Sequence, residues 1–385
     1  MRYDRVCRTN TPLKTYAGKT LYNHQGGYNG AAEDASPLEP DQYFWIASCT
    51  KVVASVAALQ CVERGLITLD APLDKHLPEL DALPIITASG EKDLFEFRKA
   101  SGVVTLRQLL THSSGVVYDF INPTLAAWRG SRGETPSLSE TGHIEEFSIP
   151  RIADPGEAWN YGTGLDWASH LVERLTETGF EDYVQKNIAQ PLGIKSWTWH
   201  MSKRPSYAEK LMKMSERKLD GTLAASKTPF RGEPLYERGG AGIYTTVDDY
   251  MRFLTDLLRD SPITLKKETM DMMFAPQFEE GSKLQKSMWD IACAPLVGQS
   301  MEGVIPNQGL GGYLTTHDIT RDDGYFKPKG TMCWHGMANL CWNANREKGI
   351  AYFFATQVIP WNEEQSQALI KAFETAVWAE FSSYR

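Results

Sequence analysis

The sequence contains no long hydrophobic run, no excess of positive charge and no apolar leader. Its most apolar stretch, residues 43–62, is interrupted by Lys51 and other polar residues, which argues against a membrane-spanning helix. The N-terminal segment has no apolar core that could act as a secretory signal. Forty lysine and arginine residues against 48 acidic residues give a net charge of −8, whereas nucleic-acid binding requires clustered positive charge. We therefore expect no membrane and no nucleic-acid partner.

Disulfide, metal and nucleotide motifs are also missing. The six cysteines have no C-x-x-C pair and no regular spacing, which favours reduced thiols and a cytoplasmic location. The eight histidines form no paired ligand pattern, so we expect no metal site. The glycine-rich phosphate-binding motifs and the G-x-S-x-G motif of α/β-hydrolases are absent, and we expect no cofactor.

What is present is an ordinary globular composition of 385 residues, 42% hydrophobic and 23% charged. Strand-like segments lie near both ends of the chain, and the middle alternates short helical patterns with long loops. This order predicts an α+β fold in which residues 1–72 and 246–385 form a discontinuous unit, an antiparallel sheet flanked by helices. Residues 73–245 would form an inserted, mostly helical domain, and the groove between the two units is the expected ligand site.

Three local patterns give more specific expectations. Thr105 precedes a short helical pattern and is expected to cap it. Thr246 and Asp249 have the spacing of a capping box at the start of another helix. Residues 350–359 form an almost continuous apolar run, which predicts one strand in the interior of a sheet.

One short motif, S-x-x-K, occurs three times, at Ser48/Lys51, Ser89/Lys92 and Ser215/Lys218. Roughly one or two chance matches are expected in a chain of this composition. The second and third copies lie in polar, charged segments and are expected on the solvated surface. The first copy opens a helical segment, about residues 48–64, that is apolar on nearly every side and is therefore expected to be buried.

The position of Ser48 favours nucleophilic chemistry. Residues three apart share a helix face, so the Lys51 amine can reach the Ser48 hydroxyl. A helix N-terminus favours a developing oxyanion, and apolar neighbours disfavour the charged form of Lys51, which would allow it to accept a proton. In the structural alternative, Ser48 only caps the helix while Lys51 extends to water. These residues alone leave both interpretations open.

A second segment, residues 154–163, places a tyrosine on a loop that enters a helix. The turn at Pro155-Gly156 precedes Tyr161, whose hydroxyl could point into a cleft. A phenol beside a lysine is more easily deprotonated, because the positive charge favours the phenolate. The alternative is an aromatic side chain that packs against Trp159.

Three segments in this order, WIASCTK with VVASVAALQCVERGL, then TLRQLLTHSSG, then PGEAWNYG, resemble the serine β-lactamase-related esterases and acyltransferases. The resemblance runs from about residue 13 to about residue 380. Further similarity to acyltransferases of fungal polyketide pathways lies in NYGTGLDWASHLVERLT, QGLGGYL and PWN. The resemblance implies the β-lactamase/transpeptidase-like fold that class C β-lactamases share with penicillin-binding proteins.

The same resemblance implies site residues. Ser48 would be the acyl-accepting nucleophile, with Lys51 and Tyr161 as the base pair. The third motif of the family would correspond to Trp334-His335-Gly336, and the backbone N–H of Met337 would join that of Ser48 in an oxyanion hole. Aromatic residues are expected in the groove walls, although each could equally be ordinary core: Tyr118, Trp128, Trp159, Trp334 and Trp361.

Three departures from the family pattern change this expectation. Tyr161-Gly162-Thr163 stands where class C enzymes have Tyr-x-Asn, and Trp334 stands where they have a lysine. Both changes remove groups that bind a β-lactam, so antibiotic hydrolysis is not expected. His335 is either a second polar group in the groove or a packed strand histidine. The helix that usually precedes the first strand is missing, so the sheet face is covered in another way or exposes apolar surface.

The resemblance implies an acyltransferase that carries an acyl group on Ser48. A thioester or ester would load the serine, and a hydroxyl of a small, polyketide-like molecule would accept the acyl group. An acyl carrier protein or polyketide synthase could deliver the donor. The alternative is a serine esterase or thioesterase that uses water as acceptor, and a third hypothesis is a catalytically silent binding protein.

Overall fold

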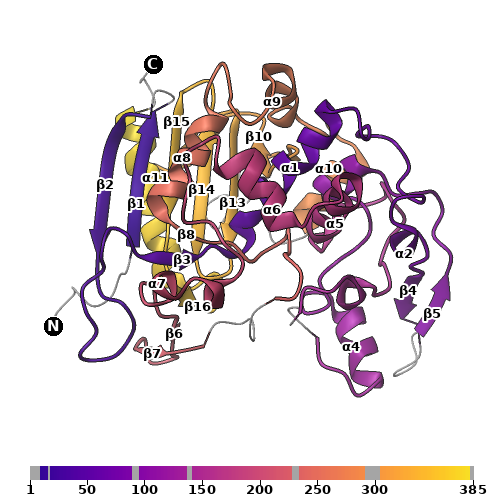
Figure 1. The fold of residues 1–385 in the computed structure, drawn as a ribbon, viewed down its shortest axis with the longest axis horizontal. Helices are drawn as coiled ribbons and strands as arrows, with labels where there is room; N and C mark the ends of the chain where they lie inside the picture. The colour runs from indigo at the N-terminus through magenta and orange to yellow at the C-terminus, as the bar shows by residue number, and fades with distance from the viewer. Residues whose placement is uncertain are drawn as a thin grey trace.

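A computed structural model of the chain describes residues 9–15, 18–88, 95–136, 141–227, 234–290 and 304–381. In these residues, strands from both ends of the chain meet in one seven-stranded antiparallel sheet, in the order β2-β1-β15-β14-β13-β10-β9 (Figure 1). The strands are β1 (Thr9–Thr15), β2 (Thr20–Gly26), β9 (Pro306–Gln308), β10 (Tyr313–Thr315), β13 (Thr331–Gly336), β14 (Leu340–Asn345) and β15 (Ile350–Phe354).

Helices cover both faces of this sheet. On one face, α11 (Glu364–Phe381) packs its Trp378 ring 6.1 Å from that of Tyr352. On the other face, α8 (Val247–Leu257) places the Tyr250 ring 4.5 Å from that of Phe353. Neighbouring residues of β15 thus point to opposite faces, as strand geometry requires. All residues of β15 are buried, because apolar helices lie on both sides.

The apolar run at residues 350–359 does not form one strand, contrary to the sequence prediction. β15 ends at Phe354, and β16 (Val358–Ile359) pairs in parallel with β6 (Ser215–Arg217). Between the two strands, the Thr356 hydroxyl donates to the carbonyl of Ala338, and the Gln357 side chain bonds to the backbone of Trp45. These two polar side chains redirect the chain from one sheet to the other.

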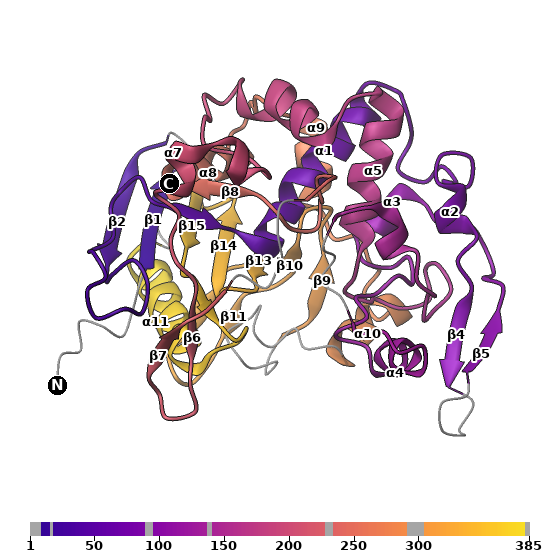
Figure 2. The ribbon, with the colours of Figure 1, turned by 60° about the horizontal axis from the view of Figure 1, so that its bottom comes forward.

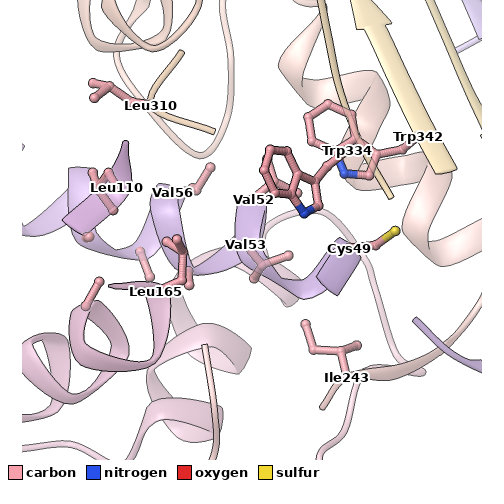
Figure 3. Close-up of a cluster of buried hydrophobic side chains, with 14 of the residues drawn as sticks. Cys49, Val52, Val53, Val56, Leu110, Leu165, Ile243, Leu310, Trp334 and Trp342 are labelled. Atoms are coloured by element: carbon pink, nitrogen blue, oxygen red, sulfur yellow. The ribbon is translucent and has the colours of Figure 1, made fainter. Parts of the chain in front are cut away.

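α1 (Lys51–Glu63) lies between the sheet and α5 (Gly164–Thr176), as Figures 1 and 3 show. Every side chain from Lys51 to Cys61 is buried, which confirms the expectation of a helix that is apolar on nearly every side. In Figure 3, Trp334 of β13 lies on one side of this helix and Leu165 of α5 lies on the other.

The middle of the chain contains short helices and hairpins. α3 (Leu106–Leu110) begins with a capping box between Thr105 and Gln108, which confirms Thr105 as its cap. Figure 2 shows α3 and α5 beside α1, with the hairpin of β4 (Ile85–Ala88) and β5 (Phe95–Arg98) beyond them. The other α-helices and strands of the described residues are α2 (Pro78–Asp81), α4 (Pro123–Ser131), α6 (Phe180–Val184), α7 (Pro205–Ala208), α9 (Lys267–Met273), α10 (Lys283–Asp290), β3 (Tyr43–Trp45), β7 (Leu223–Ala225), β8 (Tyr244–Thr246), β11 (Ile319–Thr320) and β12 (Phe326–Lys327).

Two small sheets join the segment assigned to the helical insertion to the terminal segments of the chain. β6 pairs with β16, β8 pairs with β3, and the backbone N–H of Tyr43 donates to the carbonyl of Lys210. These pairings join segments on the two sides of the predicted boundary, and the division of the chain into two domains stays a prediction. Strands of three residues are too short for their periodicity to be read.

The expected capping box before α8 is only partly formed. The Thr246 side chain accepts the backbone N–H of Asp249, as expected for a cap. The Asp249 carboxylate accepts the backbone N–H groups of Lys195 and Ser196 from a neighbouring loop. The Asp249 carboxylate is thus used in a tertiary contact instead of the local hydrogen bond that would complete the capping box. In the described residues, no helix combines the length and apolarity needed to cross a membrane.

Candidate active site

Ser48 lies in a 3₁₀ turn, Ala47–Thr50, directly before α1. Ala47 has a φ of 46°, a left-handed conformation that is strained for a residue other than glycine. The end of β13 packs against this turn: a Cβ atom at Gly336 would lie 2.7 Å from the carbonyl oxygen of Ile46. Glycine at position 336 therefore allows the two backbone segments to lie in direct contact.

The Ser48 hydroxyl contacts both partners predicted for it. Ser48 Oγ lies 2.7 Å from Tyr161 Oη and 3.2 Å from Lys51 Nζ. The Lys51 side chain is 2% exposed, so the alternative in which it extends to water does not hold. Lys51 Nζ also lies 4.8 Å from the centre of the Tyr161 ring, a distance at which the ring attracts a cation. The structure thus brings these three side chains together.

Lys51 has two further hydrogen-bond partners that were not predicted in this role. Its Nζ donates to the carbonyl oxygen of Gly240 at 2.6 Å and to Tyr118 Oη at 3.0 Å. Tyr118, expected in a groove wall, donates in turn to Asp166 Oδ2 at 3.2 Å. Burial raises the pKa of Tyr118 well above its ordinary value, and the nearby Asp166 carboxylate adds to this effect. Tyr118 therefore stays protonated at neutral pH.

β13 carries the expected third motif past these side chains, but its residues face different ways. The Trp334 ring stacks on His112 at 5.4 Å and lies 5.5 Å from the Tyr161 ring. His335 points to the opposite face of the sheet, because side chains alternate along a strand. Burial lowers the pKa of His335 to about 4, and the charges that act on it are those of Glu374 in α11 and Lys327 in β12. His335 is thus a packed strand histidine and not a group of the groove.

His112 is a buried side chain beside the candidate site that was not singled out from the sequence. Its ring packs edge-on against Trp159 and Tyr161 and stacks on Trp334. Burial lowers the pKa of His112 well below its ordinary value, and the charge of Lys51 acts in the same direction. His112 is therefore neutral at neutral pH. The available signal was its position within THSSG, one of the segments that carry the family resemblance.

The other aromatic residues expected in the groove have separate environments. Trp159 is buried, and its Nε1 donates to Gln308. Trp128 lies on α4 in a small cluster with Val117, with two arginine side chains over its ring. Trp361 is 42% exposed on the loop after β16. Of these residues, Trp334 packs directly on Tyr161. Trp159 contacts His112, which in turn packs on Tyr161.

The other copies of S-x-x-K do not reproduce this arrangement. Ser89 and Lys92 lie outside the described residues. Ser215 begins β6 and is buried, contrary to the expectation of a surface residue, whereas Lys218 is exposed and pairs with Glu216. A spacing of three places side chains together on a helix and on opposite faces of a strand.

One group of described residues has the side chains of a metal site. The ligand atoms of Glu181, His200 and Glu237 lie within 4.8 Å of one another. His200 Nε2 is hydrogen-bonded to Glu237 Oε1 at 2.7 Å and lies 3.9 Å from Glu181 Oε2. A buried histidine bonded to a carboxylate accounts for this geometry.

The chain matches one family model and several known proteins. The Beta-lactamase family matches residues 14–376. Acyltransferase calJ of Penicillium decumbens is 35% identical over 381 residues, which cover 96% of this chain and 88% of that protein. Monacolin J acid methylbutanoyltransferase of Aspergillus terreus is 33% identical, with 90% and 84% covered. Lovastatin esterase of Penicillium rubens is 31% identical, with 99% and 95% covered.

A solved structure agrees with these sequence matches. Unliganded simvastatin synthase (LovD) from Aspergillus terreus has a TM-score of 0.87 to this chain at 30% identity, covering 98% of this chain and 95% of that one. The α+β, β-lactamase/transpeptidase-like fold predicted from the sequence is confirmed. The chain belongs to the β-lactamase family, and the relatives reported above include acyltransferases and an esterase.

Proposed function

We propose that this chain is an acyltransferase that carries an acyl group on Ser48, from a thioester or ester donor to a hydroxyl of a small, polyketide-like molecule. The observation that carries the proposal is the contact of the Ser48 hydroxyl with a phenol at 2.7 Å and an amine at 3.2 Å. The relatives add support, because one is named an acyltransferase and another a methylbutanoyltransferase of monacolin J acid.

In the first step, Ser48 Oγ forms a bond to the carbonyl carbon of the donor while its proton passes to the pair of Tyr161 and Lys51. The carbonyl oxygen becomes an oxyanion, to which the backbone N–H groups of Ser48 and Met337 would donate. The tight packing of Gly336 on Ile46 supports this role for Met337, because it holds the two segments side by side. The donor's carbon–sulfur or carbon–oxygen bond then breaks, and the leaving group takes the proton.

In the second step, the acceptor hydroxyl gives its proton to the same pair while its oxygen bonds to the acyl carbon. The bond from that carbon to Ser48 Oγ breaks, and Oγ regains a proton. The two steps balance without a cofactor. The buried rings of Trp334 and His112 pack beside Tyr161 and keep its surroundings apolar.

Hydrolysis of such esters or thioesters is the second candidate. It would use the same residues with water as acceptor, and the 31% identity to a lovastatin esterase favours it. A catalytically silent binding protein is less well supported, because such a protein has no need for Ser48, Lys51 and Tyr161 in mutual contact. A carrier-protein donor and a cytoplasmic location stay predictions.

Acyl labelling tests the proposal directly. The protein is incubated with p-nitrophenyl butyrate or an acyl N-acetylcysteamine thioester, and its intact mass is measured, with Ser48→Ala as control. We expect one acyl adduct in the wild type and none in the variant. Alcohol acceptors are then added, and ester product is compared with free acid. A wild type without an adduct would refute the proposal, and dominant free acid at saturating acceptor would establish the esterase.

A further inference from the structure

Asp166 is a buried carboxylate that contacts two of the three groups bonded to Lys51. It lies in the first turn of α5 and is 4% exposed. Its Oδ1 accepts the backbone N–H of Gly240 at 2.9 Å, and its Oδ2 accepts the hydroxyl of Tyr118 at 3.2 Å. Gly240 and Tyr118 in turn accept hydrogen bonds from Lys51 Nζ, at 2.6 Å and 3.0 Å. Asp166 therefore holds two acceptors of Lys51 in place.

The backbone approaches Asp166 as closely as glycine permits. A Cβ atom at Gly240 would lie 2.3 Å from Asp166 Oδ2. The neighbouring Gly239 is fixed as well, since its N–H is bonded to the hydroxyl of Ser169, one turn along α5. The loop that presents the Gly240 carbonyl to Lys51 is thus anchored on α5 at two points.

The chemistry of the partners determines the direction of each hydrogen bond. A carboxylate only accepts, so the Tyr118 O–H points to Asp166 and the Tyr118 oxygen accepts from Lys51. The Gly240 carbonyl also only accepts. Two protons of the Lys51 ammonium are therefore committed, and the third points at Ser48 Oγ. The proton of Ser48 itself is then left to be donated to Tyr161 Oη.

We propose that Asp166 is a positioning residue that fixes the direction of this network: it holds Lys51 as a hydrogen-bond donor and so directs the Ser48 proton to Tyr161. The inference rests on the proposed function, because it concerns the acylation step on Ser48. It assigns a role to a residue that does not touch the reacting atoms.

The charges around Asp166 are consistent with this role. Burial has the largest effect on the pKa of Asp166 and raises it above its ordinary value, while Lys51 of α1 and the buried Arg238, which both face it, limit this increase. With Asp166 ionised, the three groups carry one net positive charge, which balances the negative charge of the Tyr161 phenolate that this path requires as the acceptor of the Ser48 proton. On its outer side Asp166 borders a cavity of about 30 Å³, whose other titratable residues are His143, His170, Glu173, Tyr236, Glu237 and Arg238.

Asp166→Asn tests the proposal, because it removes the charge and keeps the shape. An amide has only one acceptor oxygen, so its N–H₂ would face a donor at either Tyr118 or Gly240. We expect the rate of Ser48 acylation at saturating donor to fall about 100-fold. We also expect the alkaline limb of the pH–rate profile to move to lower pH, because the variant removes the negative charge that stabilises the cationic hydrogen-bond network. A purely structural role would lower the rate without moving the profile.

Two further variants make the test specific. Asp256→Asn is the matched control: Asp256 is fully buried at the end of α8 and accepts the backbone N–H groups of Ile263 and Thr264. This control should lower the melting temperature and leave the pH–rate profile unchanged. Tyr118→Phe removes the hydroxyl between Lys51 and Asp166 and should shift the profile in the same direction as Asp166→Asn. The double variant should lose little more than the stronger single variant, because both changes break one network.

The outcomes separate this inference from the proposed function. If the wild type forms no acyl adduct, both fail together. If the wild type is acylated but Asp166→Asn and Tyr118→Phe keep its rate, or lose rate with an unshifted profile, only the role of Asp166 is wrong. If the asparagine variant does not fold, Tyr118→Phe decides by the same two measurements.

Discussion

Replacing Lys51 by methionine separates the chemistry of this residue from its packing. The Lys51 ammonium makes three hydrogen bonds, at 2.6, 3.0 and 3.2 Å, and each bond to a charged group contributes about 1.5–3 kcal/mol. Burying the charge costs several kcal/mol, which the methionine variant avoids. The two contributions are similar in size and opposite in sign, so we expect the free energy of unfolding to change by no more than about 2 kcal/mol. Acylation should nevertheless fall about 10³-fold, or about 4 kcal/mol in activation free energy.

The assay combines intact-mass measurement of the acyl adduct with urea unfolding of the same preparations. Lys218→Met is the matched control, since Lys218 is the exposed lysine of another S-x-x-K copy and forms an ion pair with Glu216. It should keep wild-type acylation. Acylation of the Lys51→Met variant within about tenfold of the wild type would remove Lys51 from the mechanism. A folded, unlabelled variant is the expected result.

The other predictions concern a glycine packed beside the Ser48 turn, an exposed glycine on α4 and a buried ion pair behind the sheet. Gly336→Ala brings a methyl group 2.7 Å from the carbonyl oxygen of Ile46, so ester turnover should fall at least about tenfold. Gly130→Ala on the exposed surface of α4 meets nothing within 4 Å, should keep activity, and should gain up to about 1 kcal/mol in urea unfolding. Glu374→Gln leaves Lys327 buried without its 3.3 Å ion pair, and a loss of about 3 kcal/mol is expected in urea unfolding; an unchanged midpoint would contradict this. Burial alone would raise the pKa of Glu374. Lys327 and several hydrogen bonds lower it by a larger amount, so the net pKa lies below the ordinary value of 4.5. The ionised Glu374 carboxylate therefore stabilises the fold fully above about pH 4.5, and this contribution is lost as the pH falls below that value. The melting temperature should accordingly decline more steeply in the wild type than in Glu374→Gln between about pH 6 and about pH 3.

The centre of the sheet could be predicted because β13, β14 and β15 have five or six residues each, whereas much of what could not be predicted depends on shorter strands. β15 is buried on both faces, so its residues form an apolar run. β6, β7 and β8 have three residues each, and their pairing determines how the middle of the chain joins the sheet. No hydrophobic period can be read from three residues, so the sequence pattern gives no indication of these pairings.

The candidate site shows the same division between local and distant geometry. Ser48 and Lys51 are three residues apart on one helical turn, so their contact follows from local structure. The partners Tyr118 and Gly240 are 67 and 189 residues away from Lys51, and only the folded chain brings them together. The direction of His335 was accessible in principle, because strand alternation turns it away once Trp334 faces Tyr161.

The backbone of Ala47 has a consequence for comparing members of the family. At a φ of 46°, glycine, asparagine or alanine can be accommodated, whereas valine, isoleucine or threonine would clash with the adjacent carbonyl. A homologue with a β-branched residue at this position must present its serine through a differently shaped turn, even where the serine and lysine are both retained. The side chain just before the serine therefore helps to distinguish homologues that share this geometry from homologues that share only the motif.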